Sequence, residues 1–337
     1  MAAKQNTKGP AWALFDRIVA RAAPGGQHRN PWVVGEHGER RFEPDFQTLC
    51  LLLGVPLLLK ANTQSGVPAL ALDVWLSYEL RCAGFEPDQT WPRAKHPRIL
   101  PLPLAKLLRK LNGSDLGDKL RKIIERDGVP EVTSASASVL GKNYKKQVDV
   151  IITDWSTGPE LLISTKRMDS SYGKNAPNRV EESYGDAKNL RLRHPLAALG
   201  FVFGLRSDIL QKEAATAEWL FDQLIKLGRE DDAYHATCAV LMEYSNGTAP
   251  TDAGEEPPED MTREPGAEPE DDGTPADELD VDATIDQLPK VHIRLSDTPP
   301  DLLPSRFLAK IVDRVLDTTP VTMHREARKR RAQAAKA

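Results

Sequence analysis

A carboxylate and a lysine stand in two neighbouring apolar segments of this sequence. Asp149 lies inside the run VDVII, Lys166 ends the run LLISTK, and a turn with Gly158 and Pro159 separates them. Two short apolar runs joined by such a turn predict a β-hairpin, in which Ser164 and Lys166 share a face. Charged groups in apolar strands are costly to bury without a purpose. An ordinary ion pair between Asp149 and Lys166 is the alternative to a functional role.

The chemistry that suits this pair is the binding of a hydrated Mg²⁺ ion beside a phosphodiester. Mg²⁺ prefers a few carboxylates, retained waters and phosphate oxygens, and a lysine can stabilise negative charge that develops on phosphate. Other chemistries lack their motifs, because the seven histidines are scattered and no GxxxxGK[ST], GxGxxG or GxSxG sequence is present. The three cysteines, Cys50, Cys82 and Cys238, are far apart and predict buried free thiols.

Charge is distributed unevenly along the 337 residues. Residues 252–286 contain fifteen acidic residues and one basic residue, Arg263, a local charge of −14. Because the whole chain carries −4, the remainder carries +10, which is compatible with a polyanionic partner or with a scattered solvated surface. The sequence contains no run of 18 or more apolar residues, so we expect no membrane span. Its N-terminus has no continuous hydrophobic core of the signal-peptide kind, so we expect a cytoplasmic protein.

Apolar periodicity and turn residues predict an α/β fold. The expected helices are 12–21, 67–83, 104–111, 115–126, 179–194, 212–227 and 304–316, and the expected strands are 148–153, 160–166, 196–205, 236–244 and 290–295. Gly54 and Pro56 interrupt segment 46–60, which predicts that it is not one long helix. Residues 167–179 are expected to form a polar loop, residues 246–287 to be disordered and residues 324–337 to form a basic tail.

The hairpin and the helix after it resemble the PD-(D/E)xK nuclease superfamily, which has the restriction-endonuclease-like fold. The resemblance rests on QVDVIIT and ELLISTK followed by a helix with Glu181 and Glu182. It implies a mixed central sheet flanked by helices, built from a helix, a three-strand meander, a helix and a further strand. Asp149 matches the first acid of the family and Lys166 matches its lysine, but Ser164 stands where the second acid is usual. A known variation of the family places Ser there and recruits a Glu from the following helix.

The choice between the two glutamates follows from the helical period. At about 100° per residue, Val180, Tyr184 and Ala187 cluster on one face, which should pack on the sheet. Glu181 flanks that face and Glu182 points nearly opposite, so we expect Glu181 as the second metal ligand, with Glu182 as the alternate.

The resemblance then assigns roles to the remaining site residues. Asp149 and the helix glutamate would hold Mg²⁺ with the backbone carbonyl of Ile163 or Thr165. Lys166 would stabilise developing charge or orient the attacking water, and Ser164 could hydrogen-bond the carboxylate from the helix. The residues expected to contact DNA are Lys142, Lys145, Lys146, Arg167, Lys174 and Arg179. A solvated hairpin face is the alternative for the first three.

These expectations divide the chain into four parts. They are a mostly helical region for recognition or dimerisation (1–110), a nuclease core (111–245), a disordered acidic linker (246–288) and a C-terminal strand, helix and basic tail (289–337). The resemblance implies a Mg²⁺-dependent endonuclease of the type II restriction class, acting on double-stranded DNA as a homodimer beside a cognate methyltransferase. The alternatives are a DNA-binding protein on a nuclease-like scaffold without cleavage, and a nuclease subunit of a larger phage-defence or repair complex.

Overall fold

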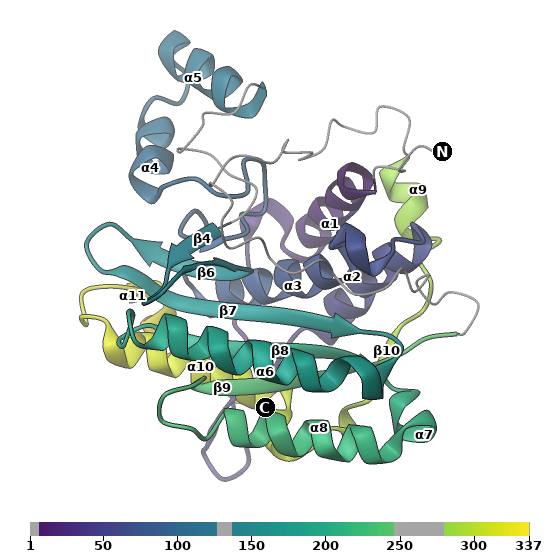
Figure 1. The fold of residues 1–337 in the computed structure, drawn as a ribbon. Coiled ribbons are helices and arrows are strands. Elements are labelled where there is room, and N and C mark those ends of the chain that lie inside the picture. Colours follow the sequence, from purple (N-terminus) through teal and green to yellow (C-terminus); the bar gives the residue numbers. More distant parts are fainter. Residues whose placement is uncertain (1–6, 127–136, 246–279, 337) are drawn as a thin grey trace.

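The computed structural model describes residues 7–126, 137–245 and 280–336 (Figure 1). At its centre lies a mixed six-stranded sheet in the order β10–β9–β8–β7–β6–β3. These strands are β3 (Thr90–Trp91), β6 (Val150–Asp154), β7 (Gly158–Met168), β8 (Ala198–Arg206), β9 (Ala236–Glu243) and β10 (His292–Ile293). The predicted α/β class, a mixed sheet flanked by helices, is confirmed.

The sheet combines one hairpin with parallel strands. β6 and β7 are antiparallel, with Val150 opposite Ile163, and β8 and β9 continue from β7 in parallel. The crossovers between the parallel strands are α6 (Tyr172–Arg191) and α8 (Ala214–Leu227). Every residue of β8 is buried, as expected for a parallel strand with both faces covered.

Helices cover both faces of the sheet (Figure 1). α6 and α8 pack on one face in a core that includes Leu162, Phe201 and Leu220. The other face packs against α3 (Val67–Ala83) and α10 (Pro304–Thr318). α1 (Lys8–Ala22) and α2 (Phe46–Leu58) join the same core, so the N-terminal helices and the sheet are packed together.

The remaining elements lie around this centre. They are β1 (Trp32–Val34), β2 (Arg40–Phe42), α4 (Leu102–Lys110), α5 (Asp115–Arg126), β4 (Ala137–Leu140), β5 (Lys145–Val148), α7 (Ile209–Lys212), α9 (Val281–Ile285), α11 (Arg325–Ala332) and β11 (Ala335–Lys336). β4 and β5 pair with each other as a separate hairpin above the sheet (Figure 1). Among the described residues, no helix is long and apolar enough to cross a membrane.

Two prolines lie inside helices, contrary to the sequence-based expectation. α2 is one helix with Pro56 near its end, and α6 begins at Tyr172 and contains Pro177, so half of the expected loop 167–179 is helical. A proline inside a helix removes one backbone hydrogen bond and crowds the carbonyl four residues earlier, at a cost of about 3 kcal/mol. In α2 that cost is offset by the burial of Leu49, Leu52 and other apolar side chains.

Part of the segment that was expected to be disordered is a docked helix. α9 buries Ile285, and its Asp282 accepts hydrogen bonds from Arg17 at 2.6 Å and Arg21 at 2.8 Å. The first part of that segment, residues 246–279, lies outside the described residues. The basic tail likewise forms α11, in which Arg330 donates to the carbonyl of Cys82 at 2.8 Å.

Candidate active site

Asp149 occupies the point at which one long strand changes partners. It is the single residue between β5, which pairs with β4, and β6, which pairs with β7. Its carboxylate accepts a hydrogen bond from the backbone N–H of Thr165 at 2.7 Å. The Asp149 side chain therefore accepts the hydrogen bond of a β7 backbone N–H at the point where the pairing of β6 with β7 ends. This contact fixes the carboxylate beside the end of β7 that carries Lys166.

The two faces of β7 have different roles, as the alternation of a strand requires. Thr165 points to the α3 side, where its hydroxyl donates to Asp73 at 2.5 Å. Arg167 also points that way and is only 1% exposed, with Asp169 at 2.9 Å. Arg167, which was expected to contact DNA, is therefore buried and has its charge paired inside the protein. Lys166, half-buried, stands on the opposite face.

The glutamate that reaches this face is Glu182. Burial acts to raise the pKa of the Glu182 carboxyl, but the positive charges of Lys166, Arg179 and Lys146 outweigh it and hold the pKa below its usual value. Arg179 also donates a hydrogen bond to Glu182 at 2.9 Å. Glu182 is thus an ionised, half-buried carboxylate in the electrostatic field of Lys166.

Glu181 is exposed, and the expected helical face needs correction. The packed side of α6 is centred on Ala176, Ser183 and Ala187, which are all buried. At about 100° per residue, Glu182 borders that side and Glu181 points nearly away from it. The predicted face of α6 was derived from apolar residues alone. It differs from the observed face, because α6 also buries the polar residues Ser183, Asp186 and Asn189.

Asp186 and Tyr144 were not identified as residues of the site from the sequence. Asp186, one turn after Glu182, is buried and lies 2.7 Å from the Lys146 ammonium. The Tyr144 hydroxyl donates to the same carboxylate at 3.2 Å. The i, i+4 spacing of Glu182 and Asp186 on one helix was the available signal. Lys146, which was expected to contact DNA, is consequently a buried partner of an acid.

Tyr234 is buried, and its phenol interacts electrostatically with three acids. Burial raises the pKa of its phenol well above the usual range, the charges of Asp186, Asp149 and Glu182 raise it further, and the Ser164 hydroxyl acts in the opposite direction. Tyr234 is therefore a neutral group that senses all three carboxylates at once. Asp149, Glu182 and Asp186 therefore all lie within electrostatic range of one buried phenol.

The other expected DNA contacts remain on the surface or near it. Lys142 and Lys145 are exposed on the β4–β5 hairpin, and Lys174 is exposed in the first turn of α6. Arg179 is half-buried on α6, with its guanidinium directed to Glu182. Three of these four cations are therefore exposed, on the β4–β5 hairpin and in the first turn of α6.

The donor set is compatible with a hydrated divalent ion. Among residues 7–126, 137–245 and 280–336, no three acidic, imidazole or thiol side chains are grouped closely enough to enclose a metal alone. Mg²⁺ does not require such a cage, because it keeps waters and shares phosphate oxygens with one or two carboxylates. Asp149, Glu182 and the backbone carbonyl of Thr165 or Ile163 are the ligands of the right type.

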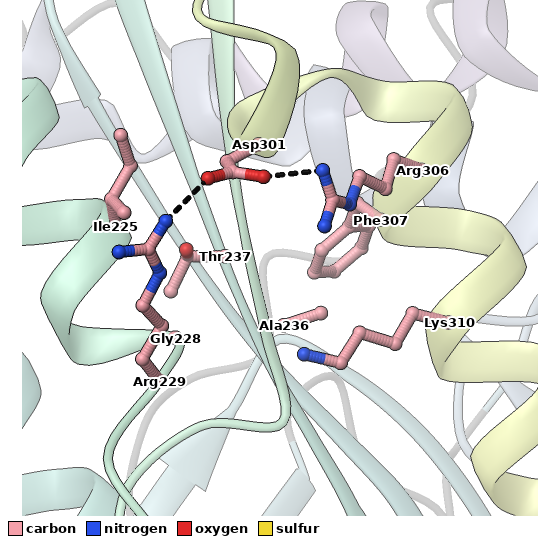
Figure 2. Close-up of a pocket in the computed structure, with 9 residues that line it drawn as sticks. All are labelled: Ile225, Gly228, Arg229, Ala236, Thr237, Asp301, Arg306, Phe307 and Lys310. Carbon is pink, nitrogen blue, oxygen red and sulfur yellow. Dashed lines mark hydrogen bonds and ion pairs between the residues drawn. The ribbon is translucent and has the colours of Figure 1, made fainter.

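A separate small cavity of about 60 Å³ lies between α8, the start of β9 and α10 (Figure 2). Arg229, Arg306 and Lys310 line it, and Asp301 accepts from Arg229 at 2.7 Å and also pairs with Arg306. Two of its three positive charges are therefore shared with one carboxylate. None of its lining residues belongs to the group around Asp149, so it is not part of the candidate active site.

No model of a known protein family matches this chain, and neither a curated protein nor a solved structure is detectably similar to it.

Proposed function

We propose that this protein is a Mg²⁺-dependent DNA endonuclease of the restriction-endonuclease-like type. The observation that carries the proposal is the electrostatic link between Glu182 and Lys166, next to Asp149 at the end of β7. The element order also supports it: α5, the β4–β5/β6–β7 meander, α6 and β8 follow the order that the resemblance implies. In the proposal, Glu182 takes the place of the second strand acid, because Ser164 occupies the position where the family usually has that acid.

Each side chain has a definite task in this proposal. Asp149 and Glu182 would hold the metal, and Thr165 would contribute its backbone carbonyl. When bound, Mg²⁺ supplies Lewis acidity that polarises the phosphate and acidifies a bound water. Lys166 neutralises charge that develops on the phosphate oxygens and orients the attacking water. The Lys146–Asp186 pair holds α6 and β5 in their relative positions, so it acts on the reaction only through Asp149 and Glu182.

A type II restriction enzyme is the more specific form of the proposal. It rests on the resemblance and on the +10 charge outside residues 252–286, which suits a polyanion. The second candidate is a DNA-binding protein without cleavage. Its support is that Glu182 is already paired with Arg179 and that no three-ligand cluster exists among the described residues.

Cleavage of DNA by the purified full chain separates the two candidates. Mixed-sequence duplex DNA is incubated with and without Mg²⁺, and any fragment ends are sequenced. We expect cutting only with Mg²⁺, and we expect Asp149→Ala to abolish cutting while DNA binding persists. Binding of DNA without Mg²⁺-dependent cutting by the wild-type chain would favour the second candidate. Equal cutting by Asp149→Ala would remove Asp149 from the site.

A further inference from the structure

An open groove of about 590 Å³ lies where the C-terminal end of α6 meets two turns. It is lined by Lys142 of the β4–β5 turn, by the β6–β7 turn and β7 start, and by the residues after α6. The lining residues are Lys142, Thr157, Gly158, Pro159, Leu192, Arg193 and His194. Two of them are positively charged and none is acidic, so the groove favours an anionic partner.

Trp155 stands in the same turn, two residues before Thr157, and is 92% exposed. Leu192, which lines the groove, and Leu196 are also exposed. A large aromatic side chain left in water is unusual and marks a surface that meets a partner. A tryptophan next to cationic groups suits duplex DNA, because the cations can meet phosphates and the apolar ring can insert at a base step.

The turn that carries Trp155 is firmly built. Asp154 accepts hydrogen bonds from the Ser156 N–H at 2.9 Å and the Ser156 hydroxyl at 2.7 Å. Thr157 donates to the buried Glu160 at 2.6 Å, and Gly158 has φ +72°, which favours glycine. The indole is therefore presented by an ordered hairpin tip, which lowers the entropy lost on binding.

The groove is connected to the candidate active site through α6. Leu192 follows Glu182 by ten residues, so it lies about 15 Å farther along the helix at 1.5 Å per residue. The β4–β5 turn is fixed to the same end of α6, because Lys142 donates its N–H to the carbonyl of Asn189 at 2.8 Å.

We propose that this groove binds the backbone of the same DNA duplex that occupies the candidate active site, with the Trp155 ring inserted against a base step. Lys142 and Arg193 contact phosphates, and Trp155 inserts its ring beside them. The inference rests on the proposed function, since it needs DNA at the site around Asp149. A protein partner fits less well, because the groove has cationic groups and lacks the acidic groups that a mixed protein surface would pair with.

The test measures binding of the full chain to a labelled duplex of about 30 base pairs, without divalent metal and over a range of salt. We expect Trp155→Ala to weaken binding about tenfold or more, because the contact of the ring with a base step is lost, and Trp155→Phe to keep most of the affinity. The double variant Lys142→Ala/Arg193→Ala should reduce the slope of log K against log salt by about 1.8, for two lost phosphate contacts.

Trp219→Ala is the matched control, because Trp219 is 39% exposed on α8 and does not line the groove. We expect it to bind like the wild type, and the melting temperature of Trp155→Ala to be unchanged. If the wild type binds DNA but both groove variants bind equally well with the same salt slope, the groove proposal is overturned and the proposed function stands. If the wild type binds no DNA at all, the proposed function itself fails.

Discussion

The Lys146 ammonium lies 2.7 Å from the Asp186 carboxylate, and the two side chains are only 5% and 9% exposed. Lys146 precedes Asp149 by three residues, and Asp186 follows Glu182 by four. The ion pair therefore joins the strand that carries one candidate metal ligand to the helix that carries the other. Breaking it should change both the stability of the protein and the positions of those ligands.

Lys146→Met should destabilise the protein by about 3–5 kcal/mol, because it leaves Asp186 buried without its partner. Lys145→Met is the matched control, since Lys145 is the adjacent residue and is exposed. Urea denaturation of both variants measures the difference. Replacing both partners, as in Lys146→Met/Asp186→Leu, should recover part of the loss. Equal stability of the Lys146 and Lys145 variants would show that the pair contributes nothing.

Glu182→Gln should reduce Mg²⁺-dependent cleavage by roughly 100-fold or more, whereas Glu181→Gln should cut at nearly the wild-type rate. Glu182 lies in the field of Lys166, and Glu181 is exposed on the other side of α6. Single-turnover cleavage of the same duplex by the two variants gives the comparison. An inactive Glu181 variant beside an active Glu182 variant would return the second ligand to the residue that the sequence favoured.

The sequence predicted the regular elements around the site better than the side chains within it. The helices at 67–83 and 115–126 were predicted at their observed bounds, and the hairpin was predicted with strands at 148–153 and 160–166. Turn residues and apolar periodicity are local, so they can be read directly. At the start of α5 the Ser114 hydroxyl accepts from the Gly117 N–H at 3.1 Å, a contact that is also local in the sequence.

Buried polar contacts between distant segments were not predictable in the same way. Lys146 and Asp186 are each polar, and nothing in either segment alone indicates that they meet. The orientation of α6 depends on such contacts. The apolar pattern alone therefore predicted that Glu182 points away from the sheet, whereas it borders the buried side of the helix. Glu79 shows the same limit, because it is fully buried against Arg29, which lies 50 residues away in the sequence.

Glu79 should make the stability of the protein depend on pH. Burial raises the pKa of its carboxyl to about 7, although Arg29 and the Asp45 N–H act to lower it. The folded state therefore keeps the proton between about 4.5, the unfolded value, and about 7. Its stabilising contribution is complete below pH 4.5 and is lost as the pH rises through 7, by roughly 3 kcal/mol.

Unfolding free energies of the wild type and Glu79→Gln across pH 4–8 measure this contribution. Because Gln does not titrate, the wild type minus variant difference should fall as the pH rises from about 4.5 to about 7 and then level off. A difference that stays flat across this pH range would show that the Glu79 carboxylate stays ionised beside Arg29.

Deleting residues 252–279 should strengthen non-specific DNA binding. This stretch holds twelve acidic residues and Arg263, a charge of −11. Its negative charge repels DNA, which the basic remainder of the chain attracts. The deletion stops before Asp280 so that α9 keeps its ion pairs to α1. Replacing the stretch with an equally long neutral Gly-Ser segment is the control for chain length.

Salt separates repulsion from a specific role of the acidic stretch. At about 20 mM salt the Debye length is roughly 20 Å, and at about 300 mM it is less than 8 Å. The gain in affinity should therefore be several-fold at low salt and should nearly vanish at high salt, equally for the deletion and the neutral replacement. Weaker DNA binding after either change would contradict repulsion and would indicate that the acidic stretch docks a partner or supports the fold.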